Sequence, residues 1–319
     1  MIFTSSCCDN LSIDEIIERA EKGDCEAHYN RDSAIDSPDD EKAFYWLKLA
    51  AEQGHCEAQY SLGQKYTEDK SRHKDNGQAI FWLKKAALQG HTFASNALGW
   101  IQDRGEDPNY KEAVAWYQIA AESGMSYAQN NLGWMYRNGN GVAQDYALAF
   151  FWYKQAALQG HSYAQDNLAD LYKDGEGVAQ NKTLAAFWYL KSAQQGNRHA
   201  QFQIAWDYNA GEGVDQDYKQ AMYWYLKAAA QESVGAYVNI GYMYKHGQGV
   251  EKDYQAAFEW FTKAAECDNA TAWYNLAIMY HYGEGRPVDL RQALDLYRKA
   301  QSSGTRDVSQ KIREIEDLL

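Results

Sequence analysis

The sequence predicts an all-α fold in which similar helix hairpins stack one on the next to form an α-solenoid. The composition of the 319 residues, 45% hydrophobic and 14% aromatic with only 3 Pro, suits a large buried core and excludes a disordered or collagenous chain. A pair of small residues followed by a turn recurs at intervals of about 36 residues, which is typical of repeat proteins. After each such anchor, apolar residues follow at spacings of four, which is the period of a helix stripe.

The anchor predicts the domain organisation. It reads A-A-E-Q-G ending at Gly54, and its equivalents end at Gly90, Gly124, Gly160, Gly196, Glu232, Asp268 and Gly304, with an earlier half-copy ending at Gly23. The successive spacings are 31, 36 and 34 residues and then 36 residues throughout, which gives eight units. We expect one domain with an N-terminal cap over 1–23, units over 24–54, 55–90, 91–124, 125–160, 161–196, 197–232, 233–268 and 269–304, and a C-terminal capping helix over 305–319.

The first half of each unit is predicted to be an amphipathic helix, named helix A here. An Ala stands four residues after the anchor, a Leu or Ile stands four residues later, and a Tyr follows in most units, as in Ala128, Leu132 and Tyr136. Residues four apart lie on one stripe of a helix, so this stripe is expected to face the core. A small residue beside the Leu, such as Gly99 or Gly133, lets a neighbouring helix approach closely.

Helix A is predicted to end in a glycine turn, after which a second helix, helix B, begins. The turn reads G-x-G-V at 139–142, 175–178, 211–214 and 247–250, and such glycines can take the left-handed conformation that closes a helix. An Asp or Asn that precedes an Ala by four residues indicates an N-cap, worth roughly 1 kcal/mol. These N-caps are Asp39, Asp75, Asn109, Asp145, Asn181, Asp217, Asp253 and Asp289. Helix B then reads A-x-x-W-Y-x-x-A-A, and we interpret its recurrent Trp and Tyr as core residues.

This series of motifs resembles the Sel1-like repeat, a relative of the tetratricopeptide repeat with a slightly longer loop. The resemblance covers about 280 of the 319 residues. It implies a right-handed superhelix with helix A on the concave side, and a role as a scaffold or adaptor in protein complexes. Unit one departs from the pattern because it is five residues short and lacks the L-G-x-x-Y segment, so we expect its helix A to be truncated. Unit two replaces the glycine turn with a charged loop over 67–74.

Charge and cysteine content restrict the partners and the compartment. The 31 Lys and Arg against 44 Asp and Glu give a net charge of −13, which disfavours binding to nucleic acid or to anionic lipid. No stretch approaches the ~18 consecutive apolar residues of a membrane span, and residues 1–10 lack the pattern of a signal peptide. Five Cys are interpreted as reduced thiols. We therefore expect a cytoplasmic protein that is a monomer and needs no cofactor.

Motifs for catalysis and metal binding give weak signals. Some cysteine-rich relatives have been linked to penicillin binding, and Ser71 to Lys74 fits S-x-x-K, but neither S-D-N nor K-T-G accompanies it. Cys25 and Cys56 occupy the same register of successive units, where helices about 8–10 Å apart exceed the reach of a disulfide. His55, His91 and His161 each follow an anchor, which favours a helix-start role over a metal site.

Helix A carries the candidate binding residues. By similarity to tetratricopeptide helices, positions 3, 6, 7, 10 and 13 after the anchor line the concave face. Asn recurs at position 7, large rings at positions 3 and 10, and cations at position 13, which suits a surface that hydrogen-bonds and packs on an extended peptide. The partner-binding candidates are Asn131, Asn167, Asn239, Asn275, Trp100, Trp134, Trp206, Tyr242, Arg137, Lys173, Lys245, Tyr127 and Tyr163. The other interpretation is that the Asn side chains brace neighbouring helices and the Trp side chains fill the interior.

The sequence therefore predicts a non-enzymatic scaffold that binds an extended segment or acidic tail of a partner protein on its helix-A face. The alternative from another functional class is a hydrolase of envelope glycans or β-lactams that uses Ser71. A third possibility is a subunit that folds stably only within a larger complex.

Overall fold

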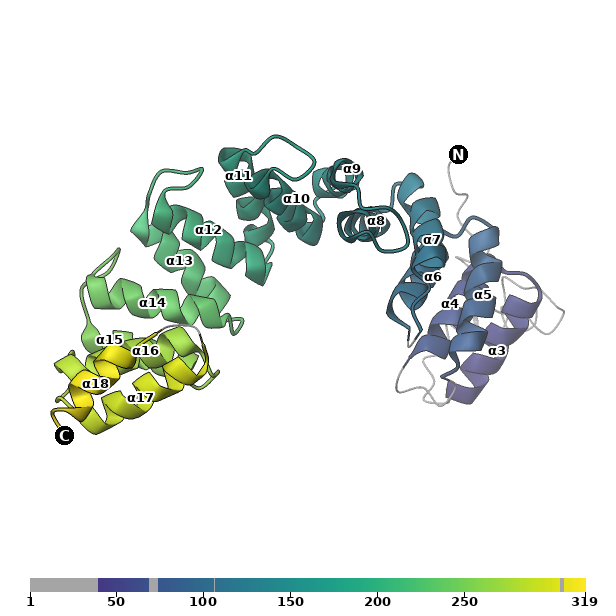
Figure 1. The fold of residues 1–319 in the computed structure, drawn as a ribbon. Coiled ribbons are helices and arrows are strands. Elements are labelled where there is room, and N and C mark those ends of the chain that lie inside the picture. Colours follow the sequence, from purple (N-terminus) through teal and green to yellow (C-terminus); the bar gives the residue numbers. More distant parts are fainter. Residues whose placement is uncertain (1–39, 69–73, 106, 305–306) are drawn as a thin grey trace, which may run out of the picture. The chain divides into compact units, whose positions relative to one another are not determined.

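In a computed structural model of the chain, residues 40–68, 74–105, 107–304 and 307–319 are described, and their regular secondary structure is entirely helical (Figure 1). The helices are α3 (Asp40–Glu52), α4 (Cys56–Thr67), α5 (Asn76–Leu88), α6 (Thr92–Arg104), α7 (Tyr110–Glu122), α8 (Ser126–Asn138), α9 (Tyr146–Leu158), α10 (Ser162–Asp174), α11 (Lys182–Gln194), α12 (Arg198–Ala210), α13 (Tyr218–Ala229), α14 (Val234–His246), α15 (Tyr254–Ala265), α16 (Ala270–Tyr282), α17 (Leu290–Ser302) and α18 (Ser309–Glu316). The predicted all-α solenoid is confirmed.

The helices alternate between the two predicted types. The even-numbered helices α4 to α16 are the A helices, and the odd-numbered helices α3 to α17 are the B helices. The predicted helix A of unit one falls within residues 24–39, outside the described residues. The chain divides into two compact units, residues 1–156 and residues 157–319, with the boundary inside α9.

The predicted helix starts are confirmed at every described position. The side-chain oxygens of the N-cap residues accept hydrogen bonds of 2.9–3.2 Å from backbone N–H groups two or three residues ahead. These residues are Asp75, Asn109, Asp145, Asn181, Asp217, Asp253 and Asp289. Asp39 lies outside the described residues. His55, His91 and His161 cap the A helices in the same way, because each Nδ1 accepts the N–H of the residue three positions ahead at 3.0–3.2 Å.

Glycine serves two separate purposes in the repeats. The glycines of the four predicted G-x-G-V turns have φ of 68–76°, the left-handed conformation that closes helix A. The glycines in the middle of helix A instead allow a close approach between helices. A Cβ built on Gly133 would lie 2.8 Å from the ring of Tyr153, and one on Gly99 would lie 2.5 Å from the ring of Tyr117. Helix B therefore packs its large side chain directly on the backbone of helix A.

The core is built from these helix-B rings and from the alanines around them. Tyr117, Tyr153, Tyr189, Tyr225 and Tyr297 are fully buried, as the repeat pattern predicts. The Trp that precedes the Tyr lies nearer the surface: Trp82 and Trp224 are buried, whereas the Trp of α7, α9, α11 and α15 are half-buried. The helix-B Trp is therefore an edge residue of the core in most repeats.

A pair of glutamines links successive repeats, which the sequence motifs did not reveal. In α10, Gln165 donates through Nε2 to the carbonyl of Ala157 at 3.2 Å, and its Oε1 accepts from Nε2 of Gln195 at 2.8 Å. The same two contacts recur at Gln59 with Gln89 and at Gln201 with Gln231. Because the accepting glutamine is buried in each case, these hydrogen bonds satisfy polar groups that burial would otherwise destabilise.

The last described helix covers the apolar end of the preceding hairpin. Ile312 and Ile315 of α18 are buried and form one cluster with Val308 and with Leu294 and Tyr297 of α17. A helix in this place buries the apolar stripe of α17, as the capping element of a repeat array does.

Candidate functional site

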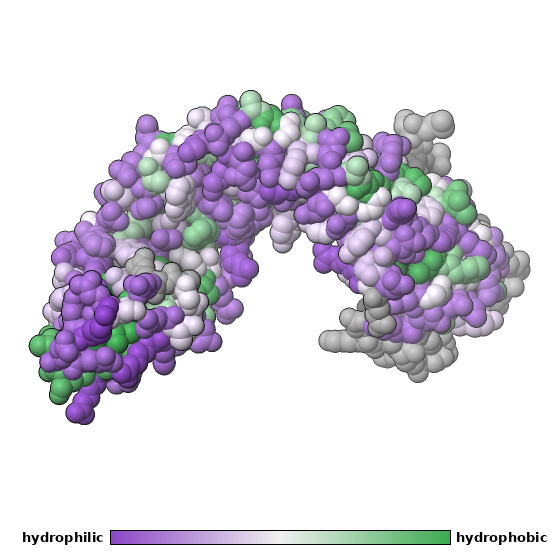
Figure 2. All heavy atoms as spheres, in the orientation of Figure 1, coloured by the Kyte–Doolittle hydropathy of each residue, from purple (hydrophilic) through white to green (hydrophobic). Residues whose placement is uncertain are grey.

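The candidate site is the A-helix face. We define it as the side chains of the even-numbered helices at positions 3, 6, 7, 10 and 13, counted from the last residue of the preceding anchor. Two rows of rings on this face are open to water. Trp100 and Trp134, at position 10 of α6 and α8, are 51% and 41% exposed. Tyr127 and Tyr163, at position 3 of α8 and α10, are also exposed. The surface shown in Figure 2 is mostly hydrophilic with separate hydrophobic areas, so these rings are not part of a generally apolar exterior.

In residues 1–156 the rings border two pockets between neighbouring A helices. The first is lined by Asn131 and Trp134 of α8 together with Asn130, Asp103 and Arg104. Asn131 contacts the α6 side chain of Asn96 through a long Nδ2 to Oδ1 distance of 3.5 Å. Burial raises the pKa of the Asp103 carboxyl, an effect that the neighbouring Arg104 partly offsets.

The second pocket lies one repeat earlier and has a volume of about 240 Å³. It is lined by Trp100, Ile101 and Arg104 of α6 and by Thr67, Lys74 and Asn76. Arg104 borders both pockets, and its guanidinium stays largely exposed while its Nε lies 3.8 Å from Oδ2 of Asp103. Each pocket therefore combines an exposed indole with amide or hydroxyl groups and a cation.

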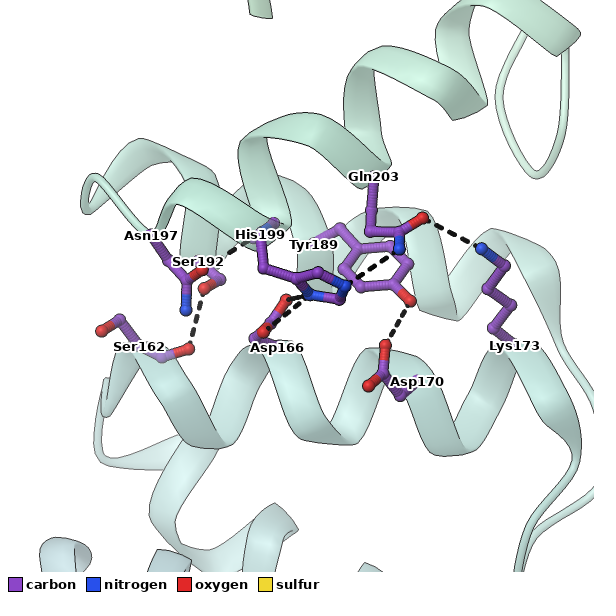
Figure 3. A network of polar contacts seen from close by, with 10 residues as sticks. Ser162, Asp166, Asp170, Lys173, Tyr189, Ser192, Asn197, His199 and Gln203 are labelled. Atoms are coloured by element: carbon purple, nitrogen blue, oxygen red, sulfur yellow. Dashed lines mark hydrogen bonds and ion pairs between the residues drawn. The ribbon is translucent and has the colours of Figure 1, made fainter. Parts of the chain in front are cut away.

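In residues 157–319 a polar network lies between α10 and α12 (Figure 3). His199 Nδ1 lies 3.0 Å from both carboxylate oxygens of Asp166, and this contact raises the pKa of the imidazole. Tyr189 donates to Asp170 at 2.6 Å (Figure 3). Lys173 Nζ donates to Gln203 Oε1 at 3.0 Å and lies 5.3 Å from the Trp206 ring centre.

Within residues 157–319, two of the predicted binding residues, Asn275 and Lys245, already make close contacts with other residues of the chain. Asn275 is only 2% exposed, and its Nδ2 donates to the hydroxyl of Tyr242 at 2.9 Å and to the Thr271 carbonyl at 2.7 Å. Lys245 forms a 2.7 Å ion pair with Glu284 in which both side chains are mostly buried. The structure thus places Asn275 as a brace between α14 and α16, and it pairs the Lys245 charge within the chain.

The other predicted residues lie on the surface to different degrees. Asn239 and Tyr242 line a pocket with His246 and Asn209. Asn167, Arg137 and Trp206 are half-buried. Within residues 1–156, exposed rings are concentrated on α6 and α8; within residues 157–319, the contacts between α10 and α12 are polar.

One buried carboxyl was missed by sequence reasoning. Asp207 of α12 is 4% exposed and stands at position 11, where Met135, Leu171 and Met243 of other repeats are buried. Burial raises the pKa of Asp207 to about 7, with Lys173 and Lys182 opposing this rise. Comparing the units position by position would have shown an acid at a site that is apolar in α6, α8, α10, α14 and α16.

The motifs that could indicate other chemistry are distributed as follows. Ser71 and His73 of the S-x-x-K segment lie outside the described residues, as does Cys25. The two described cysteines, Cys56 and Cys267, are free thiols. Within the described ranges, no group of three or more His, Cys, Asp or Glu side chains could hold a metal ion. A search of the same ranges finds no helix with the length and apolarity needed to cross a membrane.

Comparison with known proteins places this architecture in a family. The Sel1 repeat model matches eight consecutive segments, 26–55, 56–91, 92–125, 126–161, 162–197, 198–233, 234–269 and 270–304. The chain is 93% identical over 151 residues to the Sel1-repeat-containing protein YbeQ of Escherichia coli K12, an alignment that covers 46% of each protein.

Two crystal structures have the same fold. One is a protective antigen of uropathogenic Escherichia coli strains that displays an SLR fold, with 34% identity, a TM-score of 0.87, and coverage of 92% of this chain and 65% of the antigen. The other is a Sel1 repeat protein from Oxalobacter formigenes, with 27% identity, a TM-score of 0.71, and coverage of 99% and 97%. Proteins built from Sel1 repeats are generally interaction scaffolds and generally non-catalytic. Since the repeat model matches nearly all of residues 26–304, the chain belongs to the Sel1-repeat family.

Proposed function

We propose that this protein is a non-enzymatic scaffold that binds an extended segment of a partner protein on the A-helix face. The observation that carries the proposal is the exposure of Trp100 and Trp134 beside the two pockets of residues 1–156. A large ring that stays in contact with water does not gain the favourable free energy of burial. Such rings gain it when a partner covers them, and they are common anchors in protein interfaces.

The fold does not require rings at this position. Position 10 is Gln64 in α4, Asp170 in α10 and Ile278 in α16. Helices α10 and α16 have 13 residues, as α6 and α8 do, and α4 has 12. The indoles therefore serve a purpose other than holding the hairpins together, and partner binding is the purpose that suits an exposed ring.

The side chains around the rings indicate what the segment should contain. The indoles would take apolar side chains, and the carboxamide of Asn131 can both donate to and accept from a peptide backbone. Arg104, which borders both pockets, would pair with an acidic side chain of the segment. Because Lys245 is paired with Glu284 in a mostly buried contact, we assign the acidic group of the partner to Arg104, whose side chain stays 68% exposed beside its 3.8 Å ion pair with Asp103.

The double substitution Asn131→Ala with Trp134→Ala tests this proposal. Cross-linking in the native cell followed by peptide mapping identifies the bound segment, and fluorescence anisotropy then measures its affinity as a synthetic peptide. We expect the double variant to bind at least about tenfold more weakly, because removing one interface anchor typically costs more than 1 kcal/mol. The melting temperature should change little, since Trp134 is exposed and Asn131 is half-buried with only a long contact to Asn96.

The matched control uses the same register on another helix. Gln64→Ala in α4 alters position 10 where the chain has no ring, so it should leave the affinity unchanged. Trp134→Gln copies Gln64 and separates binding from folding if the double variant is unstable. Equal affinity of the wild type and Trp134→Gln would contradict the proposal, as would a partner segment that cross-links elsewhere on the chain.

We further propose that the protein acts in the cytoplasm as a monomer. The free thiols of Cys56 and Cys267 are consistent with a reducing compartment.

A further inference from the structure

A second exposed surface lies on the B helices α11 and α13. Phe187 and Tyr223 hold the same register in these helices and are 48% and 49% exposed. Leu184 and Leu226 are exposed beside them on the same helix stripes. Both helices contribute to one buried cluster, so they are fixed relative to each other within residues 157–319. We name these four residues with Lys191 and Lys227 the B-helix stripe.

The charges of the B-helix stripe are all positive. Lys191 Nζ lies 5.7 Å from the centre of the Phe187 ring, and Lys227 Nζ lies 5.6 Å from that of Tyr223. Neither α11 nor α13 contains an Asp or Glu. Among the described residues, no carboxylate forms an ion pair with Lys191 or Lys227. This is a cationic, aromatic surface on a chain whose net charge is −13.

The exposed rings of the stripe are not needed to form the hairpins. Each ring packs edge-on against the Trp that follows it, with centroid distances of 5.2 Å in α11 and 5.0 Å in α13. The same register also holds exposed rings at Tyr45, Phe81 and Phe151. It is occupied by Ala115 in α7, Glu259 in α15 and Asp295 in α17, so a ring is common there but the helix forms without one.

The neighbouring helix α15 shows a solvated face of this fold that has no ring at this register. There Glu259 accepts a hydrogen bond from Gln255 at 3.3 Å, and Lys263 and Glu266 follow on the same side of the chain. Mixed charges of this kind are typical of a helix surface that only contacts water. The B-helix stripe differs from it in charge and in the size of its apolar side chains.

We propose that the B-helix stripe binds a segment of a partner protein in which apolar side chains are interspersed with Asp and Glu. The apolar side chains of the partner would cover Leu184, Phe187, Tyr223 and Leu226, and its carboxylates would pair with Lys191 and Lys227. Burying the rings removes apolar surface from water, while the two cations select an acidic segment over a basic one. The chain then has two binding surfaces, one on the A helices and one on the B helices.

Charge distinguishes this occupant from two others. An anionic bilayer is a large negative surface, which a chain of net charge −13 approaches only against long-range repulsion. A second copy bound through a twofold interface would bring the same patch against itself, so lysine would face lysine. A short acidic segment avoids both problems because it presents its few carboxylates only at the stripe.

The test uses two synthetic peptides of equal length and apolar content, one with Glu and one with Lys at the charged positions. Fluorescence anisotropy with the full-length chain should show the Glu peptide binding at least tenfold more tightly, with an affinity that falls as salt rises. Tyr223→Glu copies Glu259 of α15, so the hairpin should fold normally while Glu-peptide affinity drops at least tenfold. Glu259→Tyr extends the stripe onto α15 and should strengthen binding.

Leu88→Ala removes an exposed apolar side chain of α5 that belongs to neither surface, so it should leave Glu-peptide binding unchanged, and loss of binding in this variant would overturn the assignment to the B-helix stripe. Equal affinity for the two peptides would also overturn the proposal. Two further measurements address the other occupants. Binding to phosphatidylglycerol vesicles that Tyr223→Glu abolishes would assign the stripe to a membrane, and self-association in sedimentation that this variant abolishes would assign it to a second copy.

Discussion

Replacing the buried acid Asp207 should make the protein more stable at neutral and alkaline pH. Asp207 lies in the core of residues 157–319 at a position that is apolar in several other repeats, and burial raises its pKa to about 7 from an ordinary value of 3.8. Between about pH 4 and pH 7, Asp207 is therefore protonated in the folded protein and ionised in the unfolded chain. Stability due to this group is complete at acidic pH and is lost as pH rises from about 4 to about 7.

The magnitude follows from the size of the shift. About three pKa units correspond to about 4 kcal/mol, of which roughly 2–3 kcal/mol falls between pH 5 and pH 8. Asp207→Asn is nearly isosteric and stays neutral at every pH. The difference in unfolding free energy between this variant and the wild type should therefore grow by roughly 2–3 kcal/mol from pH 5 to pH 8. Asp207→Met, which copies Met135 and Met243, should show the same trend.

Urea unfolding followed by far-UV circular dichroism at several pH values provides the measurement. Asp174→Asn is the matched control, because Asp174 is an exposed acid on the neighbouring A helix α10. Its difference from the wild type should stay within about 0.5 kcal/mol across the pH range, as for most surface substitutions. A pH-independent difference for Asp207→Asn would refute the reasoning, because it would mean that the folded protein does not bind the extra proton.

Three other perturbations test the structure at single residues. Gly133→Ala should destabilise the protein by about 1–3 kcal/mol in thermal or urea unfolding, because the new methyl group would meet the Tyr153 ring; no loss would mean that α8 and α9 can separate without cost. Met125 has no side-chain cap hydrogen bond, so Met125→Asn should add about 0.5–1 kcal/mol, and an unchanged melting curve would contradict this. NMR titration should place the pKa of His199 above the ordinary histidine value, and Asp166→Asn should lower it; an unchanged titration would exclude the contact drawn in Figure 3.

Much of the fold could be predicted from local patterns because the repeat fixes them one helix at a time. A residue such as Asp75 caps a helix by bonding an N–H three positions away, and Gly139 closes one through its own φ. Such interactions span a few residues, so their spacing in the sequence is sufficient to predict them. The family resemblance was visible for the same reason, since eight copies repeat the same local pattern.

The candidate site was predicted less completely, because exposure depends on the adjacent repeat. Helical periodicity placed Asn131 and Asn275 in one row, yet Asn131 lines a pocket while Asn275 is buried against Tyr242, a residue 33 positions earlier in the chain. Lys245 was expected to supply a cation, but its partner Glu284 comes from the turn of the next hairpin.

The sequence by itself determined the helix pairs, their caps, their turns and the registers at which side chains recur. Only the tertiary structure decided which members of each register remain available to a partner and where a lone carboxyl such as Asp207 is buried. The physical reason is that periodicity specifies the direction of a side chain about its own helix axis. Burial, hydrogen bonding and charge pairing depend on which side chains the neighbouring hairpin brings against it.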